Sequence, residues 1–335
     1  MSHQSPKTQI VFSDSFDPWH NLALEEYLLH KVEKNQIILY LWQNQNTVVI
    51  GRNQNPWKEC RCTALEEDGG KLARRLSGGG AVFHDLGNLN FTFIMDRDLY
   101  DLHKQLQVIL EGVKGLGIQA EFTGRNDLTV DGKKFSGNAF YFEKDKAYHH
   151  GTVLVHVDGE KVGKYLQVSK EKMAAKGVES VQSRITNLRN YVPDLSIDQM
   201  KEKLCQSFQG LYGECSEPVL VKDTDIDLMS LYEKYASWEW RYGKTPQFDL
   251  VIETRFPWGG IELGLRLNKG CITESTIYSD AMNAALIQEI SDCFLGKSFN
   301  GEELALTLEA VMVQGSDQSV IEDMKNWLKD KVKAV

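Results

Sequence analysis

The chain has 335 residues, of which 42% are hydrophobic and 25% charged, and its formal net charge is −9 at pH 7. This length exceeds what a single core usually fills, so we expect one large domain and a smaller one. Because the balance is acidic and no apolar run approaches the ~18 residues of a membrane span, we expect neither nucleic-acid nor membrane binding.

The N-terminal part combines short strands with one long helix. Its first residues lack the charged-then-apolar layout of a signal peptide, so we expect a cytoplasmic protein. A helix is predicted over residues 17–34, with Asp17 as N-cap and Pro18 at its first position. Glu26 follows Leu22 by one turn, so its carboxylate either faces inward or reaches solvent from the boundary. Strands are predicted at residues 8–14, 36–44 and 46–51.

The segment RRLSGGGAVFHDLGN, residues 74–88, places two arginines beside three consecutive glycines. Glycines permit close approach of a ligand, and successive backbone N–H groups can form an anion site. The alternative is a hinge or bulge. Arg74 and Arg75 alternate across the preceding strand, so only one can face a ligand. The segment lacks the last glycine of G-x-G-x-x-G, and neither GKS nor GKT completes a P-loop, which argues against dinucleotide binding and P-loop hydrolysis.

A β-hairpin is predicted in the segment NDLTVDGKKFSGNAFYF, after a helix over residues 99–117. Its two-residue turn is Asp131-Gly132, a strong hairpin signal. Strict alternation would place Lys134 and Ser136 on one face and Lys133 with a buried Phe135 on the other. A lysine on a rigid strand can neutralise a carboxylate or a phosphate, and the alternative is a solvated strand lysine.

The downstream pattern separates a second, smaller unit. A strand at residues 149–158 and a helix capped by Ser196 are followed by an antiparallel meander over residues 248–280 and then by helices. The fold class expected is α+β, with a mixed sheet and flanking helices, plus a small α+β accessory domain. We expect a catalytic domain at residues 1–246, a linker at 247–254 and the accessory domain at 255–335.

Metal sites and nucleophile triads find no support in the sequence. Of six cysteines only Cys60 and Cys62 are close, which is not a zinc spacing, so we expect reduced thiols. A strand would hold His150 and His156 about 20 Å apart, which excludes a metal trio with His149. No Ser-His-Asp arrangement can be argued from spacing.

Three segments together resemble lipoate–protein ligase A: RRLSGGGAVFHDLGN, GRNDLTVDGKKFSGNAF and HHGTVLVHVD. DPWHNLALEEYLL, TVVIGRNQNPWKEC and WEWRYGKTP extend the resemblance from about residue 10 to 250. It implies a catalytic domain like those of biotin ligases and class II synthetases. It also implies that lipoate and ATP, with Mg²⁺, form lipoyl-AMP and pyrophosphate. The lipoyl group would then pass to a lysine of a lipoyl domain of 2-oxoacid dehydrogenases or of glycine-cleavage H protein.

The resemblance also implies a role for individual residues. Arg75 corresponds to the adenylate-binding arginine, and Lys134 to the catalytic lysine that contacts both lipoate and phosphate. Mg²⁺ is expected on the ATP phosphates. The nucleotide-contacting loop corresponds to Gly80, Ala81, Val82 and Phe83, and the lipoate pocket to Leu22, Glu26, Trp42, Ser77 and His84.

Other activities on the same fold stay open at this stage. An octanoyltransferase uses a cysteine nucleophile, and the absence of cysteine between residues 63 and 204 counts against it. Biotin ligases carry a Gly-Arg-Gly-Arg type of loop, which this chain lacks. A non-enzymatic ligand-binding or carrier-binding protein, or a transferase that uses ready-made lipoyl-AMP, would be separated from a ligase by pyrophosphate release.

Overall fold

The computed structural model describes residues 5–123, 127–167, 185–222, 226–242, 249–268, 270–313, 315 and 317–332. Parts of three predicted segments lie outside these ranges: 124–126 at the start of the hairpin segment, 243–246 in WEWRYGKTP and 247–248 of the linker. The chain divides into two compact units. The first comprises Met1–Ile50, Pro56–Arg75 and Ala81–Arg241, and the second comprises Gly51–Asn55, Leu76–Gly80 and Tyr242–Val335.

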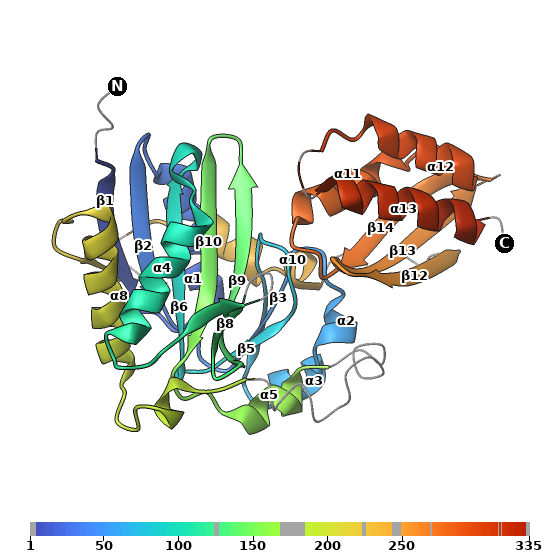
Figure 1. Cartoon of the computed structure of the whole chain (residues 1–335). Coiled ribbons are helices and arrows are strands. Elements are labelled where there is room, and N and C mark those ends of the chain that lie inside the picture. Colours follow the sequence, from blue (N-terminus) through green and yellow to red (C-terminus); the bar gives the residue numbers. More distant parts are fainter. Residues whose placement is uncertain are drawn as a thin grey trace. The chain divides into compact units, whose positions relative to one another are not determined.

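An eight-stranded mixed sheet forms the centre of the first unit (Figure 1). In spatial order its strands are β11 (Val219–Val221), β1 (Lys7–Ser13), β2 (Gln36–Trp42), β6 (Asn88–Asp96), β10 (Lys146–Leu154), β9 (Lys133–Glu143), β8 (Asp127–Val130) and β7 (Glu121–Thr123). β1 pairs in parallel with β2 and β11, and the other pairs are antiparallel. The parallel pair β1–β2 needs a crossover connection, which a helix supplies.

Helices cover both faces of this sheet (Figure 1). The crossover helix α1 (Pro18–Lys31) begins as predicted, because the Asp17 side chain accepts a hydrogen bond from the Trp19 backbone N–H. On the opposite face, α4 (Leu102–Lys114) packs against α8 (Ile197–Tyr212). Ser196 and Gln199 form a capping box at the start of α8, which confirms the predicted cap.

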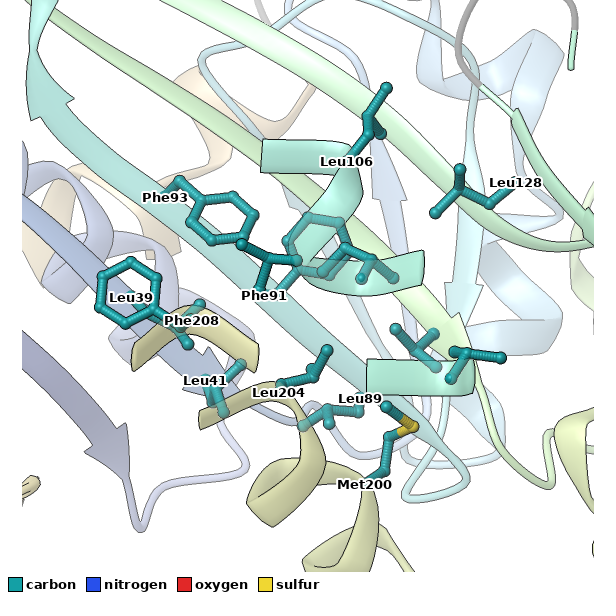
Figure 2. Packing of buried hydrophobic residues seen from close by; sticks show 14 of the residues in the cluster. Leu39, Leu41, Leu89, Phe91, Phe93, Leu106, Leu128, Met200, Leu204 and Phe208 are labelled. Atoms are coloured by element: carbon teal, nitrogen blue, oxygen red, sulfur yellow. The ribbon is translucent and has the colours of Figure 1, made fainter. Parts of the chain in front are cut away.

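The main hydrophobic core lies between the sheet and the helices α4 and α8 (Figure 2). Alternate residues of β2 and β6 point into it, and each is at most 2% exposed. Burying one such side chain contributes roughly 1.5–3 kcal/mol. The residues that Figure 2 labels from these strands are Leu39, Leu41, Leu89, Phe91 and Phe93, and those from the helices include Leu106, Leu204 and Phe208.

Shorter elements complete the first unit. A three-stranded sheet has the order β4 (Lys71–Arg74), β3 (Thr47–Ile50) and β5 (Val82–His84). The sequence pattern indicated the strand at residues 46–51, but it missed several of the short helices, since three to eight residues carry little periodicity. The remaining helices are α2 (Pro56–Glu59), α3 (Cys62–Glu67), η1 (Arg97–Leu99), α5 (Gly159–Tyr165), η2 (Leu188–Asn190), α9 (Met229–Ala236) and α10 (Trp238–Tyr242).

The second unit contains the predicted antiparallel meander, β12 (Leu250–Phe256), β13 (Gly259–Asn268) and β14 (Cys271–Ser279). Its core is shared with α11 (Ala284–Cys293), α12 (Gly301–Thr307), η3 (Leu308–Ala310) and α13 (Asp317–Val332). Residues 250–254, part of the expected linker, pair with β13 as an edge strand of the predicted meander. The two α+β units confirm the predicted fold class. None of the described helices is both long and apolar enough to cross a membrane.

Candidate active site

A row of side chains crosses the face of the large sheet that α1 covers. Trp42, Asn90 and Thr152 lie directly opposite one another on β2, β6 and β10. Gly137 on β9 extends the row, because its N–H donates to Thr152 Oγ1 at 3.2 Å. Three strand spacings separate β2 from β9, which makes this row about 14 Å long. The row therefore connects β2 to β9 across this face of the sheet.

A hydrogen-bonded network joins α1 to the same sheet face. Glu25 Oε1 accepts a hydrogen bond from Thr92 Oγ1 at 2.7 Å and lies 2.9 Å from His150 Nδ1. Thr92 Oγ1 in turn accepts from Trp42 Nε1 at 3.0 Å. All four side chains are buried, and Glu25 is 1% exposed. A buried carboxylate needs such donors, since it has lost its water.

The sequence analysis singled out Glu26 and missed Glu25. Both carboxylates are buried, because nearly every side of α1 is covered. The Glu26 oxygens lie 2.7 and 2.8 Å from Lys234 Nζ on α9, so its carboxylate faces inward but already has a cation. Leu22 is 1% exposed on the same helix. Their assignment to a lipoate pocket stays a prediction.

Arg74 is the last residue of β4 and Arg75 follows it. Their side chains point in different directions, as strand alternation predicts. Arg74 donates through Nε to the Trp240 carbonyl at 2.9 Å and through Nη2 to the Arg241 carbonyl at 2.8 Å. Trp240 Nε1 donates back to the Arg74 carbonyl at 2.8 Å. Arg74 is therefore occupied in fixing α10 against β4.

Arg75 is the arginine directed toward the polar network. It is 5% exposed, and its Nη1 donates to the Val49 carbonyl at 3.2 Å. Burial lowers the pKa of Arg75 to about 10, and the charges of Tyr148 and Glu25 oppose that shift. The guanidinium is still cationic near neutral pH, so the site holds a buried positive charge that attracts an anion.

A chain of amides fixes the tautomer of His84. Asn21 Nδ2 lies 3.0 Å from the Ser15 carbonyl and 2.8 Å from the Gln43 carbonyl, so this atom must be the donor. Asn44 Oδ1 lies 3.0 Å from the same nitrogen, which shares its two hydrogens among three acceptors, and this leaves Asn44 Nδ2 as the donor to His84 Nδ1 at 3.2 Å. His84 therefore carries its proton on Nε2.

His84 presents an unused hydrogen-bond donor. Burial lowers its pKa to about 3, and the charges of Arg75 and His150 lower it further, so the ring is neutral near pH 7. Its edge packs against Trp42, with 6.4 Å between ring centroids. No described residue accepts a hydrogen bond from the buried Nε2–H. Such a donor is costly unless a ligand or water accepts from it.

Lys134 reaches the row of side chains because β9 contains a bulge. The pairing with β8 shifts by one residue at Phe135, so the predicted face for Lys134 and Ser136 was wrong. Instead, Lys134 lies over Gly137: a Cβ on Gly137 would be 2.8 Å from Lys134 Nζ. Phe135 is fully buried as predicted, whereas Lys133 is exposed. The Asp131-Gly132 turn is confirmed, with φ of +52° and +72°.

The remaining residues expected in the nucleotide loop follow the glycines onto β5. Phe83 is 4% exposed, and its ring lies 5.5 Å from that of Tyr165. Ala81 and Val82 are half-buried. In the first unit the structure thus places these predicted site residues: Leu22, Glu26, Trp42, Arg75, Ala81, Val82, Phe83, His84 and Lys134.

Ser77 and Gly80 belong to the second unit, and there the glycines have a structural explanation. A Cβ on Gly78 would be 2.2 Å from the Ala281 carbonyl oxygen, so the close approach we expected of a ligand is made by the chain itself. Gly79 has a φ of +86° and donates its N–H to the same carbonyl at 3.1 Å. Gly80 has open space where a Cβ would lie. Ser77 is fully buried.

Comparisons with known proteins agree with these features. The family model of the lipoyl protein ligase A/B catalytic domain matches residues 17–209, and that of the bacterial lipoate protein ligase C-terminus matches residues 245–328. Among solved structures, the chain is similar to P. falciparum LipL1 in complex with lipoate, with 29% identity, 96% of this chain and 99% of that chain covered, and a TM-score of 0.85.

Two further structures extend the likeness. A bipartite lipoate protein ligase from Thermoplasma acidophilum, described with its E2 lipoyl domain, is 25% identical over 74% of this chain and 100% of its own, with a TM-score of 0.63. A lipoate-protein ligase A bound with ATP, 24% identical over 72% of this chain and 99% of its own, shares the fold with a TM-score of 0.60. The catalytic-domain model covers more than half of this chain, and the chain therefore belongs to the lipoyl protein ligase A/B family.

Proposed function

We propose that the chain is an ATP-dependent lipoate–protein ligase. In the first step, a lipoate carboxylate oxygen attacks the α-phosphorus of ATP, the bond to the β-phosphate oxygen breaks, and pyrophosphate leaves. In the second step, the amine of a carrier lysine attacks the carbonyl carbon of lipoyl-AMP, and AMP leaves as the amide forms. A mixed anhydride with AMP as leaving group needs no protein nucleophile, in keeping with a chain that has no cysteine between residues 63 and 204.

Two cations on the α1 face would do the electrostatic work. Lys134, held over Gly137, would neutralise the lipoate carboxylate and the α-phosphate, and Arg75 would bind the adenylate. The lipoyl chain would lie along the row from Gly137 toward Trp42 and His84. The neutral Nε2–H of His84 would donate to an acceptor on the ligand. Glu26 and Leu22 would line the lipoate pocket, and for Ser77 the sequence resemblance alone supports a contact with lipoate.

The observation that carries this proposal is a polar row about 14 Å long with a cation at one end, in a chain of this family. Its length suits an extended medium-length acyl chain with a carboxylate at the Lys134 end. The similarity to P. falciparum LipL1, which is described in complex with lipoate, supports the same ligand. The nucleotide would contact Gly80, Ala81, Val82 and Phe83.

Magnesium fits this scheme as a companion of ATP. Among residues of described position, no group of three or more His, Cys, Asp or Glu side chains is placed to hold a metal ion. Mg²⁺ prefers phosphate oxygens and few protein ligands, so we assign it to the ATP phosphates, where it would offset their charge. Residues 1–246 would form the catalytic domain and residues 255–335 the accessory domain.

The carrier would be a lipoyl domain of a 2-oxoacid dehydrogenase or glycine-cleavage H protein in the cytoplasm. The T. acidophilum relative, described with its E2 lipoyl domain, supports the first of these. Mass spectrometry of each carrier after incubation should show one lipoyl adduct on its acceptor lysine. Labelling that continues after this lysine is replaced would contradict a site-specific ligase.

Pyrophosphate release tests the proposal directly. Lipoate and MgATP, without any carrier protein, should release pyrophosphate in stoichiometric amount with lipoyl-AMP. Two comparison reactions are run. One offers octanoate together with an octanoyl carrier, and the other offers preformed lipoyl-AMP. Transfer from lipoyl-AMP with no pyrophosphate release would replace the ligase by a transferase of the same fold. Binding of lipoate without either reaction would reduce the protein to a ligand-binding role.

A further inference from the structure

Lys134 forms an ion pair in this structure. Its Nζ lies 2.7 Å from Asp127 Oδ1, across the hairpin formed by β8 and β9. Asp127 is paired with Gly137 in this hairpin, and the Lys134 side chain lies over the same glycine. The bulge at Phe135 and the missing side chain at Gly137 thus bring the ammonium group to the carboxylate. The backbone of the hairpin builds this ion pair.

The pair is held by charge rather than by a hydrogen bond. The side chains of Lys134 and Asp127 are 35% and 38% exposed, so water screens their attraction. Asp127 Oδ1 itself is buried and makes no hydrogen bond with the described residues. The Glu26–Lys234 pair, by contrast, has a carboxylate that is 10% exposed and a second oxygen on the same ammonium. An exposed pair of this kind contributes about 1 kcal/mol or less, which a bound ligand anion can replace.

We infer that Asp127 is a built-in competitor for the ligand anion: it neutralises Lys134 until a carboxylate or phosphate takes its place. The inference rests on the proposed function, in which Lys134 receives the lipoate carboxylate. Asp127 is a positioning residue here, because it acts through Lys134 and touches no reacting atom. It lowers the affinity of the site for anionic ligands and leaves the affinity for a neutral ligand of the same shape unchanged.

Isothermal titration without ATP tests this inference with two ligands, lipoate and its neutral amide, lipoamide. Asp127→Asn removes the competing charge and keeps the shape of the side chain. The variant should bind lipoate about two- to fivefold tighter than the unmodified protein, the range that an exposed ion pair allows, and lipoamide should bind as before. In steady state, the same variant should show a lower KM for lipoate.

Two further variants of the chain distinguish a local effect at Lys134 from an effect of net charge or of folding. Glu111→Gln removes an equally exposed carboxylate, one paired with Lys114 on α4, and should leave lipoate affinity unchanged. In a Lys134→Met background, Asp127→Asn should no longer tighten lipoate binding. Circular dichroism and the melting temperature check that each variant folds.

The results of these titrations distinguish the inference about Asp127 from the proposed function. Unchanged or weaker lipoate binding by Asp127→Asn overturns the inference and leaves the proposed function intact. Equal tightening of lipoate and lipoamide, or tightening that persists without Lys134, also overturns it, because the effect would then not run through the ammonium group. If the unmodified protein binds neither lipoate nor lipoamide, the proposed function fails, and the competitor role fails with it.

Discussion

The two faces of the eight-stranded sheet are built from alternate residues of the same strands but are stabilised differently. On β6, Phe91 and Phe93 enter the core beneath α4 and α8. Asn90 and Thr92 lie on the other face, which α1 covers. The first face is held by close packing, and the second by hydrogen bonds between buried polar groups.

Two adjacent histidines illustrate this difference. His149 lies on the packed face, 5.6 Å from Phe91 between ring centroids, and both of its nitrogens have partners, Gln105 and Asn138. His150 lies on the polar face and contacts Glu25. On that polar face, Asn90 Nδ2 lacks a partner among the described residues, and so does His84 Nε2 of β5, whose ring lies against Trp42. The packed face is dominated by apolar contacts, although Tyr212 Oη and Ser136 Oγ lack partners there among the described residues, whereas the polar face has nitrogen donors that a ligand can use.

Phe93→Ala should give the largest effect and should fall on stability. Removing this fully buried ring leaves a cavity, so the free energy of unfolding should fall by about 3–5 kcal/mol. Thr92→Ser, one residue along on the other face, keeps the hydroxyl that bonds Glu25 and should cost much less. Urea unfolding of both variants measures the contrast. A loss below about 1 kcal/mol for Phe93→Ala would refute close packing at this face.

Lys134→Met should give the largest effect on chemistry. The charge that we place between carboxylate and α-phosphate is lost, so the rate of pyrophosphate release should fall by roughly 10²-fold or more. Lys133→Met is the matched control, because that side chain is exposed and should cost little. If Lys133→Met is the damaging change, the assignment of the catalytic lysine is wrong.

Sequence patterns predicted the elements that define this contrast but not their fine register. The cap at Asp17, the Asp131-Gly132 turn and the burial of Phe135 were all predicted from local chemistry. Alternation failed at Lys134, because a bulge adds one residue and depends on how β8 and β9 pair, which no local pattern encodes.

Contacts between residues that are distant in the sequence were the second feature that the sequence patterns could not predict. Glu25 meets His150 across 125 positions, and Glu26 meets Lys234 across 208. On a helix buried on most sides, as α1 is, hydrophobic periodicity cannot tell which carboxylate points at the sheet. The close approach at Gly78 also could not be predicted from the local pattern, because the backbone that approaches it comes from residues 281–282. Tertiary contacts, rather than local propensity, decided each of these positions.

Acid should destabilise the protein through its buried neutral histidines. The pKa of His84 is about 3 in the folded state, against 6.5 for an ordinary histidine, because burial disfavours the charged ring. Between these values only the unfolded state binds the proton, so this stability is complete above pH 6.5 and is lost as the pH falls toward 3. At pH 5 the loss is about 2 kcal/mol from this histidine.

A His84→Gln variant isolates that contribution from the carboxylates that also titrate in acid. Urea unfolding at pH 7 and pH 5 should show that the unmodified protein loses about 2 kcal/mol more than the variant over this interval. His149 provides a second case on the packed face, since burial lowers its pKa to about 3 as well. Equal losses in the unmodified protein and in His84→Gln would mean that His84 is charged or solvated in the folded state.

Gly137→Ala should give the smallest change, and it separates the two faces most cleanly. The added Cβ would be 2.8 Å from Lys134 Nζ and 2.9 Å from Cε, closer than real side chains approach. Since both atoms are at the far end of a flexible chain, Lys134 can move aside by about 1 Å at little cost in stability. The displaced ammonium group no longer meets the carboxylate correctly, so kcat for pyrophosphate release should fall roughly tenfold.

The matched control is Gly210→Ala on α8, where a Cβ would meet nothing within 4 Å. Alanine replaces glycine inside a helix there, so the free energy of unfolding should rise by about 0.5–1 kcal/mol and activity should not change. Circular dichroism melting and single-turnover pyrophosphate release, run on both variants, give the two readouts. If Gly137→Ala lowered the melting temperature strongly while kcat stayed constant, Gly137 would serve packing of the strand, and the placement of Lys134 over it would have no part in the chemistry.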